Sequence, residues 1–131
     1  MKATADAAAS TDAPLSEPVE GAIDLEHLAR MTLGERSLEA EVLTLFERQA
    51  AVLLARMRVS APAAAAALAH TLKGSARGIG AWRVAAAADA VEFYATRAAA
   101  GGLAGLVAKL SATVDETKAF IADRLRSHGP F

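Results

Sequence analysis

Hydrophobic side chains recur at helical spacing along most of this chain. The longest such segment runs from Glu35 to about Val59, and its charged side chains fall mostly between the apolar ones. Apolar positions that repeat every three or four residues share one face of an α-helix. We therefore predict an amphipathic helix over this segment. Its buried stripe is expected to consist of Leu38, Val42, Leu45, Phe46, Val52, Leu53 and Met57.

Start and stop signals define two neighbouring helices. Asp24 is a residue type that commonly caps a helix N-terminus, and it predicts a short helix that ends near residues 32–34. The segment Ser60-Ala61-Pro62 predicts the start of another helix, because proline is tolerated in a first helical turn. That helix is expected to run to about Arg77 and to end at Gly78-Ile79-Gly80, since glycine readily adopts a positive φ.

The remaining periodic segments predict helices over about residues 81–100 and 103–126. Five helices and no strand pattern indicate an all-α fold, an up-and-down four-helix bundle with an additional short N-terminal helix. We assign residues 22–127 to this bundle, which fits one domain in a chain of 131 residues. Residues 1–21 are expected to form a disordered leader, and residues 128–131 a C-terminal tail.

Composition narrows the class of protein. Alanine supplies 35 of the 131 residues, and its high helix propensity and small side chain favour closely packed helices. The chain has no cysteine, which excludes disulfides and thiol chemistry, and its net charge of −1 gives no electrostatic footprint for nucleic acid. No apolar run reaches the roughly 20 residues that span a bilayer, and the N-terminus lacks the pattern of a secretory signal. We expect a cytoplasmic protein that binds neither nucleic acid nor membrane.

Candidate chemistry centres on His70 in the third predicted helix. At 100° per residue, the apolar residues Leu68, Leu72 and Ile79 lie about 160° to 180° from His70, so the histidine points away from the core. The residues within about 60° of it are small or cationic. They are Ala66, Ala67, Lys73, Gly74 and Arg77. A lone histidine on a helix surface is most simply an ordinary polar residue, so its interpretation depends on these neighbours.

Gly74 and the two cations favour a chemical role. Glycine inside a helix costs roughly 1 kcal/mol relative to alanine, the commonest residue of this chain. Its missing Cβ opens a path for another macromolecule to approach the imidazole of His70. Lys73 and Arg77 would neutralise an anionic group on that ring. A phosphoryl group is the anion that suits a nucleophilic imidazole flanked by cations.

Several segments together resemble the signature of histidine-containing phosphotransfer (HPt) domains. They are HTLKGSA at 70–76, IGA at 79–81 and Val91-Glu92, with Ile23-Asp24-Leu25 at the first helix and Leu45-Phe46 on the second. The resemblance covers roughly residues 22–126. It implies a helical bundle whose exposed histidine accepts a phosphoryl group from a receiver-domain aspartate or a kinase and passes it to another receiver aspartate.

The resemblance also implies roles for four residues. His70 is the phosphoryl acceptor, Lys73 its charge partner, and Gly74 the position that gives a partner access. Glu92 is expected to accept a hydrogen bond from Nδ1 of His70, which leaves the lone pair on Nε2 facing outward. The alternative for Glu92 is an ordinary solvated acid.

Three further residues are expected to belong to a docking surface. Arg77-Gly78 stand where the family often has small or amide residues, so Arg77 is either a docking or phosphate contact or a solvated cation. Ala66 and Ala67 belong to an alanine run that would offer a partner helix a smooth surface beside His70.

The sequence indicates no cofactor or metal site. It has no glycine-rich phosphate loop after a strand, so ATP binding is not expected. Asp89 and Glu92 are three residues apart but have no evident third partner for Mg²⁺. His27 on exposed positions of the first helix and His128 in the tail would have to converge on His70 to bind a metal. We expect Mg²⁺ to belong to the receiver partner, and the chain to be a phosphoryl carrier without independent catalysis rather than an enzyme.

These observations predict a free-standing, monomeric histidine phosphotransfer protein of a two-component phosphorelay. Its expected partners are response-regulator receiver domains and a hybrid or sensor histidine kinase. The alternative is a helical adaptor or inhibitor that docks on a kinase or receiver without being phosphorylated. Substitution of His70 separates the two functions, because only the carrier needs the imidazole.

Overall fold

The structure, a computed structural model, describes residues 21–97 and 100–128, and the described residues contain helices and no strand. The helices are α1 (Leu25–Met31), α2 (Arg36–Arg58), α3 (Pro62–Ile79), α4 (Trp82–Thr96), the short 3₁₀ helix η1 (Ala100–Gly102) and α5 (Leu103–His128). The predicted all-α fold is confirmed. All but the last residue of the predicted leader lies outside the described residues, as do residues 129–131 of the predicted tail. His128 belongs to α5 and not to a tail.

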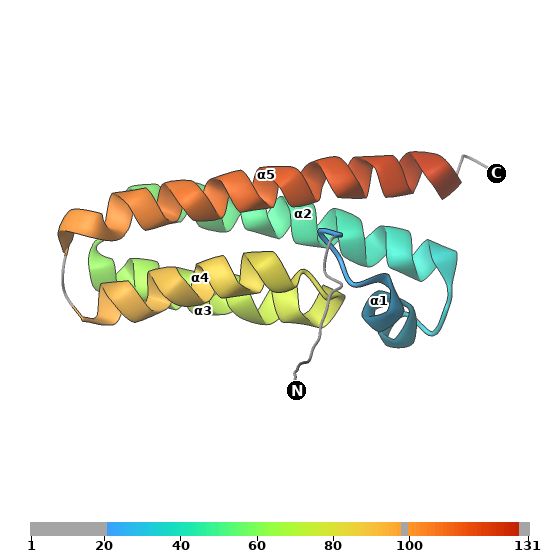
Figure 1. Cartoon of the computed structure of the whole chain (residues 1–131), viewed down its shortest axis with the longest axis horizontal. Coiled ribbons are helices and arrows are strands. Elements are labelled where there is room, and N and C mark those ends of the chain that lie inside the picture. The colour runs from blue at the N-terminus through green and yellow to red at the C-terminus, as the bar shows by residue number, and fades with distance from the viewer. Residues whose placement is uncertain (1–20, 98–99, 129–131) are drawn as a thin grey trace, which may run out of the picture.

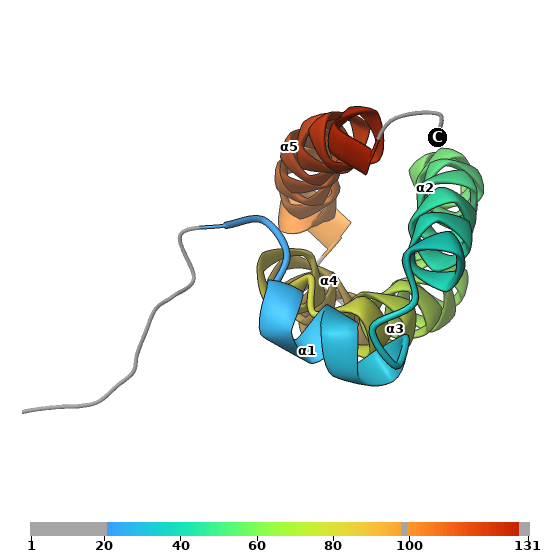
Figure 2. The ribbon, with the colours of Figure 1, turned by 90° about the vertical axis from the view of Figure 1, so that its right-hand side faces the viewer.

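Four long helices form the bundle, and the short α1 lies across one end of it (Figures 1 and 2). Each of α2, α3 and α4 packs against the next long helix along the chain, and α5 also packs against α2. The most extensive of these interfaces joins α3 to α4. α1 contacts α3 at the end where α3 stops and α4 begins.

The ends of α3 follow from its sequence, with one correction. Pro62 is the first residue of the helix, as predicted. Gly80 caps the other end with φ +81°, and a Cβ there would lie 2.9 Å from the carbonyl oxygen of Asp24. Both conditions require glycine at this position. Gly78 lies inside the helix, so α3 extends two residues beyond its predicted end at Arg77. α4 ends at Thr96 instead of continuing to residue 100.

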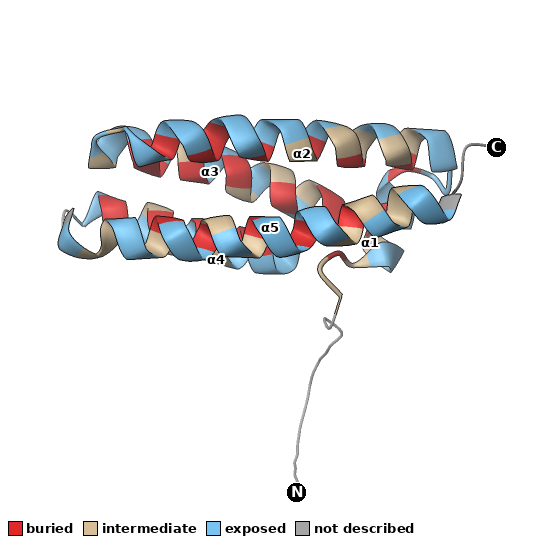
Figure 3. Ribbon diagram, turned by 90° about the horizontal axis from the view of Figure 1, so that it is seen from above, coloured by how far each residue is buried: buried red, intermediate tan, exposed pale blue. Residues whose placement is uncertain are grey.

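The core lies where the four long helices face one another (Figure 3). Phe46, Leu53 and Met57 of the predicted α2 stripe are buried. Leu45 and Val52 are 59% and 55% exposed, so their predicted burial is wrong. They lie about 100° and 120° around the helix from Phe46, outside the arc that faces α3 and α5. Positions omitted from the prediction complete that arc, namely Leu43, Ala50 and Leu54.

Asp24 joins α1 to the turn between α3 and α4. Its carboxylate caps α1 by accepting a hydrogen bond from the backbone N–H of His27 at 3.1 Å, and it accepts a second bond from Nε1 of Trp82 at 3.0 Å. The backbone N–H of Asp24 donates to the carbonyl of Gly80 at 2.8 Å. The bond from Trp82, followed by that from His27, holds the pKa of the Asp24 carboxyl below its usual value. We call this group of residues the α1 joint.

His27 belongs to the α1 joint and not to the open surface that the sequence suggested. Its ring is half-buried and lies 4.9 Å from the Trp82 ring, centroid to centroid, in an edge-on arrangement. Its Nε2 atom is buried and has no hydrogen-bond partner among the described residues. Trp82 and Phe93 are 39% and 56% exposed, and Phe93 lies under the Arg97 guanidinium.

Within the described part of the chain, none of the helices is both long and apolar enough to cross a membrane.

Candidate functional site

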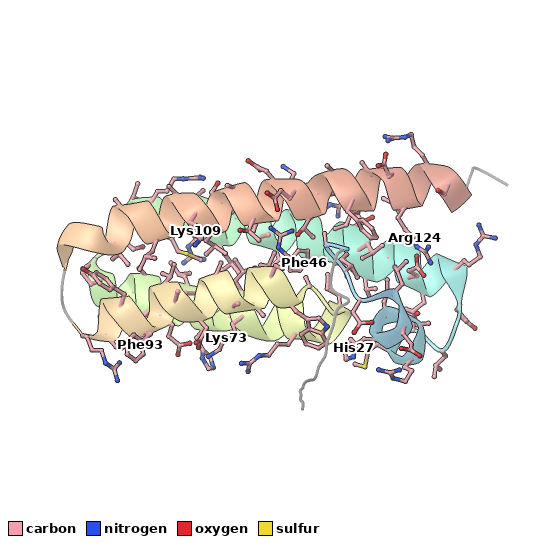
Figure 4. The ribbon with its side chains drawn as sticks, in the orientation of Figure 1. His27, Phe46, Lys73, Phe93, Lys109 and Arg124 are labelled. Atoms are coloured by element: carbon pink, nitrogen blue, oxygen red, sulfur yellow. The ribbon has the colours of Figure 1, made fainter. Side chains whose placement is uncertain are left out.

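His70 projects from the side of α3 that faces away from the core. Leu72 and Ala76 on the same helix are fully buried, whereas the His70 side chain is 68% exposed. The site lies on the outer face of the α3–α4 pair, where Figure 4 shows Lys73 on the side away from α5. The amphipathic pattern of α3 therefore places the imidazole of His70 in solvent while the opposite face of the helix packs in the bundle.

Glu92 on α4 holds one ring nitrogen of His70. Nδ1 of His70 and Oε2 of Glu92 are 2.9 Å apart. A carboxylate can only accept hydrogen bonds, so this contact requires the proton of a neutral imidazole to be on Nδ1. The lone pair is then on Nε2, and no group among the described residues pairs with that atom. The ring is thus oriented at one nitrogen and open at the other.

Lys73, expected on the same face of α3 as His70, is bound by carboxylates of α4. Its Nζ lies 2.7 Å from Oε1 of Glu92 and 3.0 Å from Oδ1 of Asp89, and its side chain is only 13% exposed. Lys73 is therefore paired with two carboxylates of α4 rather than freely exposed beside His70. The contact with Asp89 was missed in the sequence analysis. The antiparallel pairing of α3 and α4 could have indicated this contact. Lys73 is three residues after His70 on α3, and Asp89 is three residues before Glu92 on α4, so the two pairs match across the interface.

These ion pairs favour the charged forms of both partners. The contact with Lys73, and more weakly that with His70, holds the pKa of the Glu92 carboxyl below its usual value. The contacts with Glu92 and then Asp89 raise the pKa of the Lys73 ammonium. At neutral pH the site therefore contains one ammonium between two carboxylates, and one of these carboxylates also holds the imidazole.

Gly74, one turn beyond His70, faces open space. A Cβ built on it would meet nothing within 4 Å, so the packing of this chain does not require glycine there. Gly78, a further turn along, is open in the same way. The bundle itself gives no reason for two helix-weakening residues on this face.

The predicted docking residues separate into two groups. Ala67 and Arg77 are exposed, as a docking surface requires. Ala66 is only 7% exposed, so its predicted place on this surface is wrong. It lies about 40° around the helix from His70, but an alanine methyl projects so little from the backbone that neighbouring side chains cover it. Position around a helix predicts exposure less well for alanine than for a long side chain.

The described residues contain no group of three or more His, Cys, Asp or Glu side chains that could hold a metal ion. Asp89 and Glu92, which the sequence analysis considered for Mg²⁺, both contact Lys73 instead. The ring of His27 belongs to the α1 joint and is not part of the His70 site. That Mg²⁺ comes from a receiver partner stays a prediction.

Comparison with known proteins gives one family match. The model of the Hpt domain matches residues 41–121, which is more than half of the chain and includes His70, Lys73, Asp89 and Glu92. No curated protein and no solved structure matches the chain. An exposed histidine held by a carboxylate of the next helix, on a four-helix bundle, agrees with this match, and the chain belongs to the Hpt domain family.

Proposed function

We propose that this chain is a phosphoryl carrier of a two-component phosphorelay and that His70 is the residue that carries the phosphoryl group. Membership of the Hpt family indicates a phosphotransfer role in two-component signalling. The observation that carries the more specific proposal is the state of the His70 ring. Nδ1 is held at 2.9 Å by Glu92, and Nε2 has no partner among the described residues on a side chain that is 68% exposed.

The proposed reaction is a direct transfer between an acyl phosphate and the imidazole. The lone pair of Nε2 attacks the phosphorus of an aspartyl phosphate on a receiver domain. The P–O bond breaks, the aspartate leaves as a carboxylate, and a P–N bond forms. Transfer to a second receiver is the reverse reaction with a different aspartate. Such a reaction depends mainly on positioning and on charge compensation, for which the receiver would supply Mg²⁺.

Glu92 would contribute in two ways. It fixes the tautomer in which Nε2 is the nucleophile. It also stabilises the positive charge that develops on the ring as Nε2 bonds to phosphorus while Nδ1 keeps its proton. The ion pair with Lys73 keeps Glu92 ionised for this task.

Gly74 supports the same proposal because it leaves room for a receiver domain to approach His70. A receiver must bring its aspartate to Nε2, so its backbone and side chains must pass close to α3. The open space over Gly74 permits that approach, and exposed Ala67 and Arg77 border it. The partners we propose are receiver domains, with a hybrid or sensor kinase as the source of the phosphoryl group.

The test is incubation of the purified chain with each phosphorylated receiver domain and each histidine kinase of the source organism. We expect rapid appearance of one phosphorylated residue, identified as His70 by mass spectrometry, with the acid-labile and base-stable behaviour of a phosphohistidine. A His70→Gln variant should bind the same receivers but accept no phosphoryl group.

His27→Gln is the matched control, because it changes a histidine of the α1 joint and leaves the His70 site intact. We expect it to be phosphorylated normally. If every partner leaves the chain unphosphorylated, or if His70→Gln still relays phosphoryl groups, the proposal is wrong. Binding of a receiver without phosphorylation would instead favour the adaptor or inhibitor.

A further inference from the structure

The Lys73 ammonium is already shared between two carboxylates of α4. Its ammonium contacts Glu92 at 2.7 Å and Asp89 at 3.0 Å, and the side chain is 13% exposed. The contact with Glu92 lies on the Nδ1 side of the His70 ring, because Glu92 also holds Nδ1. A phosphoryl group on Nε2 would be on the other, solvent-facing side of the ring. Two of the three N–H donors of the ammonium are thus engaged on α4, so a phosphoryl group would compete with these carboxylates for the ammonium.

The two contacts of Lys73 differ in how easily they are given up. Asp89 has the longer contact, and its side chain is 58% exposed, so water can solvate the carboxylate when the ammonium leaves. Glu92 has the shorter contact, is 26% exposed, and is held in place by His70. The contact with Asp89 is thus the one that the ammonium can lose at lower cost.

We propose that Asp89 is a positioning residue that competes with the phosphoryl group on His70 for the Lys73 ammonium. In the unphosphorylated chain Asp89 and Glu92 share Lys73. On phosphorylation the ammonium leaves Asp89 for the phosphoryl oxygens and keeps its contact with Glu92. This inference rests on the proposed phosphorylation of His70 and adds a residue to which the sequence analysis gave no role in transfer.

Competition by Asp89 has a defined thermodynamic consequence. Whatever stabilises the Lys73 ammonium only in the unphosphorylated state makes phosphohistidine less stable by comparison. Asp89 would therefore make His70 a better phosphoryl donor and a weaker acceptor. Because Asp89 is largely exposed, the effect should be modest, of about two- to fivefold in the phosphorylation equilibrium.

An equilibrium between phosphoramidate and ammonium measures this effect without any protein partner. Nε2 attacks the phosphorus of phosphoramidate, the P–N bond of the reagent breaks, and ammonia leaves with that bond's electron pair. Added ammonium drives the reverse reaction. The measured quantity is the ammonium-to-phosphoramidate ratio at which half of His70 is phosphorylated, followed by the ring signals of His70 in two-dimensional ¹H–¹⁵N spectra so that other histidines do not contribute.

Four variants make the test specific. Asp89→Asn should raise the ratio about two- to fivefold, since the ammonium is released to the phosphoryl group. Asp89→Glu should keep the ratio of the unchanged chain, because its carboxylate still reaches Lys73. Lys73→Met should lower the ratio. In the Lys73→Met background, Asp89→Asn should have no further effect, which is the signature of a residue that acts through another.

Asp115→Asn on α5 is the matched control for net charge, and thermal unfolding followed by circular dichroism verifies that each variant folds. An unchanged ratio in Asp89→Asn would overturn the proposal, and a lower ratio would show that Asp89 holds Lys73 in place for the phosphoryl group. If Asp89→Asn changes the ratio equally with and without Lys73, Asp89 acts only by direct repulsion of the phosphoryl group, and the proposal is wrong. This equilibrium involves His70 and a small phosphoryl donor but no protein partner. Failure of all receivers to phosphorylate the chain would therefore refute the proposed relay without affecting the measured role of Asp89.

Discussion

The α1 joint and the α3–α4 site each combine a histidine with a carboxylate, yet they use the pair in opposite ways. In the joint, Asp24 binds the backbone N–H of His27 and the indole of Trp82, and the His27 ring is packed edge-on against that indole. In the site, Glu92 binds the ring of His70 directly, and the ring is left in solvent. A carboxylate that binds backbone fixes the position of a helix. A carboxylate that binds one nitrogen of an exposed imidazole defines the reactivity of the other.

The largest expected effect that tests this comparison comes from Glu92→Ala. Without the carboxylate, neither the tautomer nor the developing ring charge of His70 is favoured, so we expect transfer from a phosphorylated receiver to slow about tenfold to a hundredfold. Single-turnover transfer kinetics give the rate. The same assay on Asp24→Ala should show an unchanged rate as long as the protein is folded. Equal rates for Glu92→Ala and the unchanged chain would remove the distinction between the two carboxylates.

Gly74→Leu separates access to His70 from its chemistry. We expect receiver-dependent transfer to fall by about tenfold or more, because a side chain would occupy the approach path, while helix stability rises by up to about 1 kcal/mol. Phosphorylation by phosphoramidate, a small donor, should proceed at the normal rate. Gly78→Leu, two turns from His70, is the control with the same gain in helix propensity and a smaller effect on transfer. Normal receiver transfer in Gly74→Leu would contradict the role given to this glycine.

Asp24→Ala tests the structural side of the comparison. Loss of the α1 cap should lower the free energy of unfolding by about 1 kcal/mol in urea denaturation. Because the folded state lowers the pKa of Asp24, its contribution to stability is complete above about pH 4 and is lost as the pH falls through the lowered pKa. The difference in stability between Asp24→Ala and the unchanged chain should therefore shrink in acid. A difference that is constant with pH would show that the carboxylate does not make these bonds in solution.

The smallest expected effect concerns the titration of Glu92. Lys73 is the main cause of its lowered pKa, so Lys73→Ala should move the Glu92 titration, followed by its ¹³C carboxyl signal, to higher pH. The contact with His70 is retained above the ordinary carboxyl range in both proteins, and on acidification it should be lost at a higher pH in the variant. Lys73→Ala should also slow transfer a few-fold without unfolding the bundle. An unchanged titration would mean that the ion pair contributes little in solution.

The helix ends were predictable because single residues specify them. Asp24, Pro62 and Gly80 act through their own backbone geometry or capping atoms, and the structure places all three at helix ends. The end of α4 carries no such signal, since its alanine-rich sequence continues past Thr96 with high helix propensity. The position of the buried face of α2 was also not determined by periodicity alone. Leu45 is as apolar as Leu43, and only the placement of the neighbouring helices decides which of them is covered.

The site was predictable on α3 and only in part across the interface. The angle of His70 to the core residues of its own helix follows from helix geometry and gives its exposure. The partners of Lys73 depend on how α4 is aligned with α3, which no pattern within α3 reveals. The hydrogen bond from Trp82 to Asp24 links residues 58 positions apart, and it arises only when α1 folds back onto the α3–α4 turn.

The connection from α3 to α4 consists of Gly80 and Ala81, and its length determines which residues of α4 lie opposite which residues of α3. One inserted residue would rotate the start of α4 by about 100° and carry both of its carboxylates away from the imidazole and the ammonium. The four side chains of the site all belong to this single α3–α4 hairpin, namely His70, Lys73, Asp89 and Glu92. Variation along α2 and α5 can therefore alter the robustness of the bundle while the reactive geometry stays constant, whereas a change of length in this one turn would abolish it.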